Sequence, residues 1–194
     1  MTIWFVSDTH ISHRNIRNYC PWRKTWAASI DEMDAKIIEE WNKAVQPGDT
    51  IYHLGDVAFA QKGDKPTRLR YLRSILNGHV KVAVGNHDHS VAKMIEYGYD
   101  AAHNFELIHE GVTITMRHDP RRFRQTEVAY STILLHGHSH GKPQPPRYGA
   151  DSFKMFDVGV DAVQSIRPLT FEELVFRFQQ HRNQSCLTNL PKSS

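Results

Sequence analysis

Residues Val80–Asp88, with the sequence VKVAVGNHD, show the pattern from which the fold of this chain can be predicted. The stretch begins as an apolar run interrupted only by Lys81, and it ends in Gly85 followed by three polar residues. A short apolar run bounded by turn residues predicts a buried strand. The polar residues that follow are then expected to lie at the end of that strand, at the edge of a sheet.

The same pattern, an apolar run followed by a polar cluster, recurs along the chain. Two earlier runs cover Ile3–Ser7 and Thr50–Leu54. The polar clusters are Asp8-Thr9-His10, Gly55-Asp56, Gly85-Asn86-His87-Asp88, His118 and Gly137-His138-Ser139-His140. Because each cluster follows a predicted strand, we expect a sheet to bring the clusters together at one edge.

Amphipathic helices separate the early strands. Ser29 and Glu32 have the spacing of a capping box, and apolar residues at helical spacing follow as far as Val45. Further helices are predicted over Lys65–Leu76 and Ser90–Tyr97. Alternating strands and helices predict a parallel or mixed sheet with helices on its faces.

The second half of the chain is richer in strands. The predicted elements are strands over Phe105–Ile108, Val112–Met116, Thr132–Leu135 and Phe153–Val160, a tight turn at Glu110-Gly111, and a final helix over Phe171–Gln180. Together the two halves predict an α/β sandwich of two sheets. We expect a single domain over residues 1–182 and a polar C-terminal tail over residues 183–194.

Length and composition narrow the class of protein. The chain has 194 residues, of which 40% are hydrophobic and 23% charged, as in a globular domain rather than a disordered chain. No apolar stretch approaches the roughly 18 residues of a membrane span, and the N-terminus reads as a core strand rather than a signal peptide. A net charge of +3 is too small to indicate nucleic-acid binding without local clustering. Cys20 and Cys186 lie far apart, which favours a reducing cytoplasm over a disulfide framework.

The polar clusters carry residue types that bind metal ions. Asp8 and His10 are two residues apart, so both can face one ion from an extended chain. Asp56 follows a glycine that permits a sharp turn, where a carboxylate can bridge two cations; the alternative is an ordinary turn aspartate. His138 and His140 are flanked by glycines and are hard to explain by packing.

The third and fourth clusters complete the donor set. Asn86 offers an amide oxygen, and the adjacent His87 would point elsewhere, toward a substrate; the alternative is an ordinary strand-to-helix turn. His118 by itself could also be a core histidine. The set contains carboxylate, imidazole and amide donors but no thiolate, which suits Mn, Fe, Zn, Co or Ni better than Mg or Ca. A paired-metal site of this kind most often hydrolyses phosphate esters.

The clusters, taken in order, resemble the calcineurin-like metallophosphoesterase family. Its pattern is Asp-x-His, Gly-Asp, Gly-Asn-His-Asp/Glu, His and Gly-His-x-His, and all five elements stand between residues 8 and 140. Residues Asp157–Asp161 and Pro168-Leu169 also resemble the endings of small bacterial or phage members. The resemblance implies the metallo-dependent phosphatase fold, a four-layer α/β sandwich with two mixed β-sheets flanked by helices.

The resemblance also implies roles for individual residues. Asp56 would be shared by two metal ions, and manganese is favoured. The ligands of one ion would be Asp8, His10, Asp56 and His140, and those of the other Asp56, Asn86, His118 and His138. His87 would be catalytic. The protein-phosphatase branch carries a second aspartate three residues after its Gly-Asp, and Phe59 stands there in this chain, so the partner of His87 is left open.

The implied reaction is attack on phosphorus, in line, by a hydroxide that bridges the two ions. The insertions between the clusters are short, so we expect an open cleft that admits phosphodiesters of nucleotide-like substrates. Two alternatives remain: a phosphomonoesterase acting on a small phosphorylated metabolite, and a non-catalytic metal-binding scaffold for protein interaction. The presence of His87 argues against the scaffold.

Residues outside the clusters add candidate substrate contacts. His13 and Arg14 could reach a phosphate, although a solvated loop is the alternative. The stretch from Arg14 to Trp26 mixes basic and aromatic side chains, which can bind nucleotides or single strands. The alternative is a surface whose long side chains cover core aromatics. Nucleic acid and a homo-oligomer are therefore possible partners.

Overall fold

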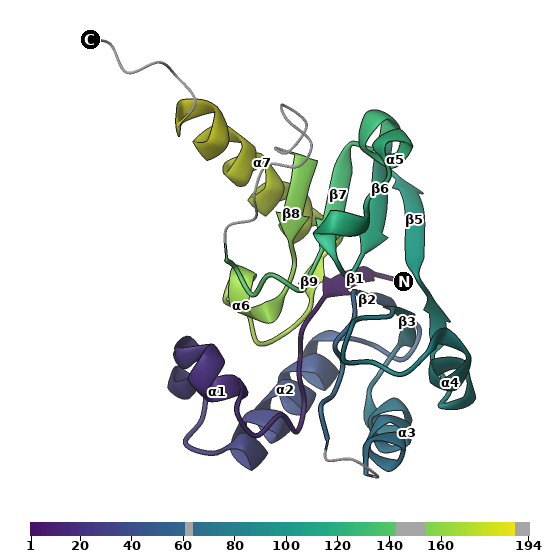
Figure 1. Cartoon of the computed structure of the whole chain (residues 1–194), viewed down its shortest axis with the longest axis vertical. Coiled ribbons are helices and arrows are strands. Elements are labelled where there is room, and N and C mark those ends of the chain that lie inside the picture. Colours follow the sequence, from purple (N-terminus) through teal and green to yellow (C-terminus); the bar gives the residue numbers. More distant parts are fainter. Residues whose placement is uncertain (61–63, 143–153, 189–194) are drawn as a thin grey trace.

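The computed structural model describes residues 1–60, 64–142 and 154–188, and in them the chain forms two mixed β-sheets (Figure 1). The first has the order β4-β3-β2-β1-β9, and the second β5-β6-β7-β8. The strands of the first are β1 (Ile3–Val6), β2 (Thr50–His53), β3 (His79–Ala83), β4 (Asp100–Ala102) and β9 (Leu169–Thr170). Those of the second are β5 (Asn104–His109), β6 (Val112–Arg117), β7 (Ile133–His136) and β8 (Met155–Asp157). Strands β1 to β4 are parallel and β9 is antiparallel, while β6 to β8 are parallel and β5 is antiparallel.

Helices surround the sheets. The α-helices are α1 (Ile16–Tyr19), α2 (Ile30–Ala44), α3 (Lys65–Ile75), α4 (Val91–Glu96), α5 (Gln125–Tyr130), α6 (Val160–Val163) and α7 (Phe171–Thr188), with short 3₁₀ turns η1 (Pro21–Thr25) and η2 (Pro120–Arg122). Helix α2 begins where the sequence predicts, because the Ser29 hydroxyl accepts a hydrogen bond from the Glu32 N–H at 3.1 Å. The Glu32 carboxylate accepts from the Ala28 N–H instead of completing the box at Ser29.

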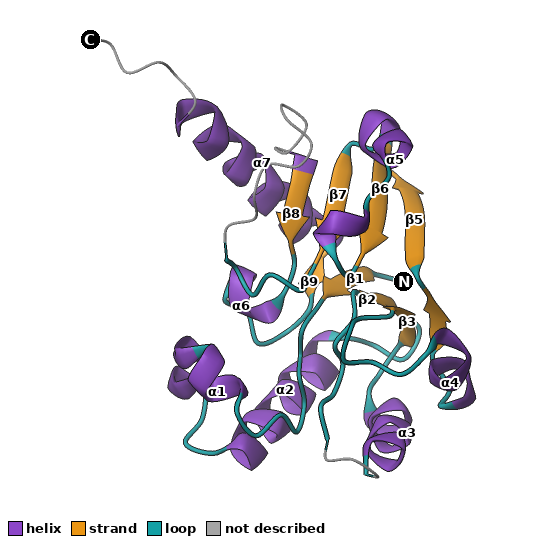
Figure 2. Cartoon of the chain, viewed as in Figure 1, coloured by secondary structure: helices purple, strands orange, loops and turns teal. Residues whose placement is uncertain are grey.

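Alternation along the strands produces the four layers. In β1, Trp4 and Val6 join the core beneath α2 and α3, whereas Phe5 joins the core between the two sheets. In β7, Leu134 faces away from that second core and packs with Val128 of α5. The order is therefore helices, sheet, sheet, helix, and Figure 2 shows α2 and α3 on the face of the first sheet that is turned away from the second.

Two predicted elements differ from the structure. The strand expected over Phe153–Val160 is wrong in its second part: β8 ends at Asp157 and Val160 begins α6, because the chain bends at Gly159, whose N–H donates to the Asp157 carboxylate at 2.8 Å. Phe153 lies outside the described residues. The final helix continues past Gln180 to Thr188, since no glycine or proline interrupts the sequence there.

Within the described segments, no helix combines the length and apolar character needed to cross a bilayer. Cys20 is a buried free thiol.

Candidate metal centre

The polar clusters meet at the carboxyl ends of the parallel strands. Strands β1, β2 and β3 are adjacent and end nearly level, because Val6 pairs with His53 and His53 with Val82. Backbone hydrogen bonds then join the turns that follow: the Asp8 N–H donates to the Gly55 carbonyl at 3.0 Å. At the second sheet, the Gly137 N–H donates to the His118 carbonyl at 3.0 Å. The sheet edge thus gathers all five clusters, as the strand pattern predicts.

Five of the predicted ligands have an unusual backbone conformation. Eight non-glycine residues in the described part of the chain have positive φ, and five of them are Asp8, His10, Asp56, His138 and His140. The left-handed region costs an L-residue roughly 1–2 kcal/mol. Such strain persists where the surrounding structure fixes it, most often at functional sites. The positive φ values turn the chain sharply after the strands and direct these five side chains toward one another.

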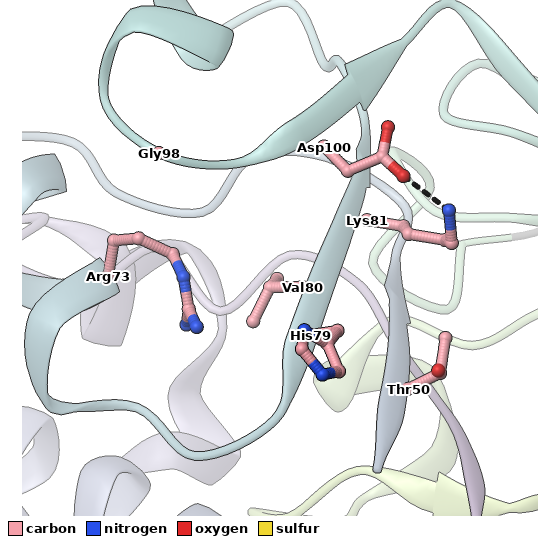
Figure 3. Close-up of a pocket in the computed structure, with 7 residues that line it drawn as sticks. All are labelled: Thr50, Arg73, His79, Val80, Lys81, Gly98 and Asp100. Carbon is pink, nitrogen blue, oxygen red and sulfur yellow. Dashed lines mark hydrogen bonds and ion pairs between the residues drawn. The ribbon is translucent and has the colours of Figure 1, made fainter. Parts of the chain in front are cut away.

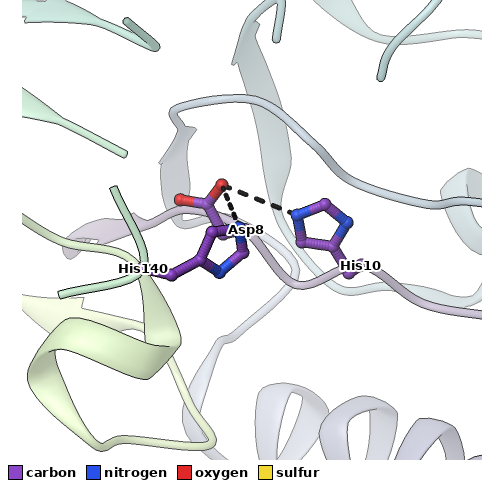
Figure 4. Close-up of side chains that lie close together, drawn as sticks. All are labelled: Asp8, His10 and His140. Carbon is purple, nitrogen blue, oxygen red and sulfur yellow. Dashed lines mark ion pairs between the residues drawn. The ribbon is translucent and has the colours of Figure 1, made fainter. Parts of the chain in front are cut away.

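Asp8, His10 and His140 form the first group of candidate ligands (Figure 4). The Asp8 Oδ1 lies 3.7 Å from the His10 Nε2 and 3.9 Å from the His140 Nε2. These distances are too long for hydrogen bonds, and they suit donors placed around a common ion. Burial lowers the pKa of His10 to about 4, so its imidazole is neutral at neutral pH. Neither ring nitrogen of this buried side chain has a hydrogen-bond partner.

Asn86, His118 and His138 form the second group. The Asn86 Oδ1 lies 2.9 Å from the His118 Nε2 and 2.8 Å from the His138 Nδ1. His118 Nδ1 lies 2.7 Å from the Leu54 carbonyl, which can only accept, so this nitrogen carries a proton. In the neutral ring, Nε2 then presents a lone pair to the oxygen of Asn86. That arrangement is favourable only with a cation or a proton between the two atoms.

Asp56 lies between the two groups. Its Oδ2 is 3.5 Å from the His10 Nε2 and 3.6 Å from the His118 Nε2. Burial raises the pKa of Asp56 to about 7; the charges of Asp8 and Asp88 add to the rise, although His118 opposes it. The ionised carboxylate is therefore costly here without a cation. An orphaned imidazole, opposed lone pairs and crowded carboxylates together fit a metal-binding site.

Asp88 fixes the turn that carries Asp56 rather than joining either group of candidate ligands. Its carboxylate accepts hydrogen bonds from the backbone N–H groups of Asp56, Val57 and Gly85 at 2.7, 3.0 and 2.8 Å. The sequence motif therefore combines a candidate ligand, Asn86, with a residue that fixes a neighbouring turn.

Gly85 and Gly137 leave room for the candidate ligands. A Cβ on Gly137 would lie 2.3 Å from the Asp8 Oδ2 and 2.0 Å from the Ser7 hydroxyl oxygen, and a Cβ on Gly85 would lie 2.1 Å from the Asp56 Oδ1. Real atoms do not approach so closely, so either substitution would displace a carboxylate of the centre.

Gly137→Ala is accordingly expected to weaken Mn²⁺ binding at least about 10-fold, the scale of a disturbed ligand environment. Calorimetric titration of the metal-free protein measures this. Gly48→Ala is the matched control, because a Cβ there meets no atom within 4 Å. Unchanged Mn²⁺ affinity in Gly137→Ala would show that the Asp8 carboxylate is not a ligand in its observed position.

His87 lies outside both groups, at the exposed side of the centre. Its ring is 38% exposed, and its Nε2 is 4.0 Å from the Asp56 Oδ2. The ring centroid lies 4.9 Å from that of Phe59 in edge-to-face geometry and 5.5 Å from that of His10. The position where a second aspartate would stand is thus filled by an aromatic ring that contacts His87.

The two predicted substrate contacts lie in one loop after β1. His13 is buried, and its ring stacks on Phe59 with 4.4 Å between centroids and lies 5.4 Å from His10. Its Nδ1 accepts a hydrogen bond from the Asn15 N–H at 3.2 Å. Arg14 is exposed, and its contact with a phosphate stays a prediction.

Two arginines of the basic and aromatic stretch form hydrogen bonds within the protein. Arg17 donates to the carbonyls of Ala27 and Ala28, and Arg23 is fully buried. The interpretation of Arg23 as a surface side chain is therefore wrong; its charge is paired with Asp161. No sequence pattern assigns a role to Asp161, and its place in the segment Asp157–Asp161 is a weak signal.

Asp161 also belongs to a third possible cation-binding group, with Cys20 and His140. Its two oxygens, however, already accept hydrogen bonds from Trp22, Arg23 and His140 at 2.6–2.7 Å. A carboxylate with four such donors and a paired guanidinium has no free oxygen for a metal ion. We assign this group to the support of His140.

A separate pocket of about 370 Å³ lies at the opposite, amino-terminal ends of β2 and β3 (Figure 3). The Lys81 ammonium pairs with the Asp100 carboxylate, and the Arg73 guanidinium donates to the carbonyls of Leu76 and Gly78. Its cationic groups thus have partners within the protein, and it contains none of the predicted site residues.

Comparison with known proteins agrees with this geometry. The family model described as the calcineurin-like phosphoesterase superfamily domain matches residues 1–149. An uncharacterized protein of Methanocaldococcus jannaschii is 32% identical over 140 residues, covering 71% of this chain and 69% of its own. The gene 66 protein of Mycobacterium phage D29 is 26% identical over 193 residues, covering 86% and 92%. A crystal structure of a protein of unknown function from Aquifex aeolicus has the same fold, with a TM-score of 0.66 at 24% identity over 91% of this chain and 98% of its own.

Proposed function

The chain belongs to the calcineurin-like phosphoesterase superfamily, and on that premise we propose that it is a dinuclear-metal-dependent phosphodiesterase acting on nucleotide-like substrates. The observation that carries the proposal is the position of Asp56, whose Oδ2 lies within 3.6 Å of donors from both ligand groups. One ion would be held by Asp8, His10, Asp56 and His140, and the other by Asp56, Asn86, His118 and His138.

Two divalent ions in this centre would supply Lewis acidity toward a phosphate ester and a nucleophilic water. The residues of the chain prepare the place for that chemistry. Neutral His10 and the Leu54-bound His118 direct ring nitrogens at the centre; a strained turn holds His10, and the hydrogen bond to the Leu54 carbonyl holds His118. His87 is partly exposed beside Asp56, so it can donate a proton to the leaving oxygen or stabilise charge on the phosphoryl group.

Diester preference is supported by the short insertions between the polar clusters, which favour an open cleft at the centre. The cytoplasmic location, manganese as the native ion, a nucleic-acid partner and a homo-oligomer stay predictions of the sequence.

The experiment that tests the proposal is hydrolysis of bis-p-nitrophenyl phosphate and p-nitrophenyl phosphate by the Mn²⁺-loaded protein. We expect the diester to have the higher kcat/KM. Preference for the monoester would make the protein a phosphomonoesterase. Two bound ions with no turnover of either substrate, or of 2′,3′- and 3′,5′-cyclic nucleotides, would favour the binding scaffold.

Removal of metal is expected to abolish this activity. Treatment with a chelator followed by desalting should leave no turnover above the uncatalysed rate, and stoichiometric Mn²⁺ should restore it. Comparing recovery with Mn²⁺, Zn²⁺ and Mg²⁺ tests the donor set, because imidazole-rich sites favour the first two. Full activity of the chelator-treated protein, with metal content verified as zero, would refute metal dependence.

A further inference from the structure

Asp161 is hydrogen-bonded to His140, and its carboxylate accepts four hydrogen bonds in all. The Oδ2 accepts hydrogen bonds from the His140 Nδ1 at 2.7 Å and from an Arg23 Nη at 2.6 Å. The Oδ1 accepts from the Arg23 Nε and from the Trp22 Nε1, both at 2.7 Å. A carboxylate held by four donors cannot rotate, so the direction of its bond to His140 is fixed.

Arg23 connects this carboxylate to the first polar cluster. Its side chain is fully buried, and besides binding Asp161 it donates to the backbone carbonyls of Asp8 and Thr9 at 2.7 and 2.9 Å. One guanidinium therefore ties the turn that carries Asp8 to the helix that supports His140. These segments are separated by more than a hundred residues in sequence; the first carries the candidate ligand Asp8, and the second holds His140, a candidate ligand of the same ion, through Asp161.

We propose that Arg23 and Asp161 are positioning residues for the ion held by Asp8, His10 and His140, an inference that rests on the proposed metal centre. A carboxylate bonded to Nδ1 keeps the proton on that nitrogen and leaves Nε2 free to bind a cation. In this structure, Nε2 of His140 is the nitrogen that faces Asp8. Arg23 holds both the Asp161 carboxylate and the turn that carries Asp8. The distance between the candidate ligands Asp8 and His140 therefore depends on Arg23.

We expect the effect of replacing Asp161 to fall on the ion that His140 would hold. In the other group, His118 has its Nδ1 fixed by the backbone carbonyl of Leu54, which involves neither Arg23 nor Asp161. A substitution at Asp161 should therefore lower the affinity for one ion and leave the affinity for the other unchanged. General loss of structure would lower both affinities.

The test is a titration of the metal-free protein with Mn²⁺. Calorimetry measures the binding of each ion, and electron paramagnetic resonance spectra are recorded during the titration. Wild type should bind two ions and show the spectrum of a coupled pair. In Asp161→Asn, an amide N–H₂ group must face some of the donors now bound by oxygen. We expect one ion to bind as in wild type, the other about 10- to 100-fold more weakly, and the spectrum of a single uncoupled ion at one equivalent.

Asp49→Asn is the matched control for the loss of a buried, multiply bonded carboxylate. Asp49 accepts hydrogen bonds from Thr2, Trp4 and Gln46 at the far end of the sheet. This variant should lower the melting temperature and leave both Mn²⁺ affinities unchanged. If Asp161→Asn keeps both Mn²⁺ affinities of the wild type, or if both affinities fall equally, the inference is overturned.

A second measurement needs no variant to fold. Nitrogen NMR of the Zn²⁺-loaded, ¹⁵N-histidine-labelled wild type reports which ring nitrogen of His140 carries the proton. We expect a protonated Nδ1 and a metal-bound Nε2, and the reverse would overturn the inference. If Asp161→Asn loses one ion from a protein that hydrolyses no phosphate ester, the inference holds and the proposed function fails.

Discussion

Asp56→Asn is expected to abolish metal-dependent hydrolysis, lowering kcat at least about 10³-fold. Asparagine preserves the shape of the side chain but removes the charge that two cations would share. The backbone N–H of Asp56 would still donate to Asp88, so the turn should persist. Because burial raises the pKa of Asp56 to about 7, an ionised carboxylate is unfavourable in the metal-free protein. The neutral variant should therefore be at least as stable as wild type when metal is absent.

The assay measures turnover of bis-p-nitrophenyl phosphate at saturating Mn²⁺, with melting temperatures recorded after chelation. Asp100→Asn is the control, since Asp100 is an exposed carboxylate paired with Lys81, far from the centre. That variant should match wild type in turnover. Near-normal turnover in Asp56→Asn would refute the assignment of Asp56 as the shared ligand.

His87→Ala should keep both metal ions and lose about 10²- to 10⁴-fold in kcat. The prediction follows from the position of the ring, which contacts Phe59 and lies 4.0 Å from the Asp56 carboxylate, outside either ligand group. Metal content by mass spectrometry and turnover by the diester assay separate binding from chemistry.

His89→Ala provides the comparison, because His89 belongs to the same loop and its ring is hydrogen-bonded to the Tyr97 hydroxyl at 2.9 Å. It should retain turnover within a few-fold of wild type. If His87→Ala instead loses one equivalent of Mn²⁺, His87 is a ligand and the division of roles proposed for Asn86 and His87 is wrong.

The sequence predicts the architecture well where a local pattern reports it. Apolar runs such as Thr50–Leu54 and the cap at Ser29 depend on neighbouring residues, and each appears in the structure as β2 and the start of α2. Convergence of the clusters also follows from a general rule, because parallel strands place their carboxyl ends at one edge. Two-residue β9 and three-residue β4 are too short to show a period, and no pattern predicts them.

The support of the candidate centre could not be predicted in the same way. Arg23 and Asp161 are 138 residues apart, and neither has a local pattern that distinguishes a buried pair from solvated charges. Contact between Phe59 and His87 is likewise set by the way two turns pack at the sheet edge. The candidate ligands could be predicted because their residue types and their spacing are those of a metal site. Their supporting residues come together only in the folded structure.

The most direct test of the paired metal centre is a crystal soaked in Mn²⁺ and measured at the manganese absorption edge. We expect two anomalous peaks, one beside Asp8, His10 and His140 and the other beside Asn86, His118 and His138. Asp56 should contact both peaks. A single peak, or two peaks that Asp56 does not join, would show that Asp56 is not shared by two metal ions.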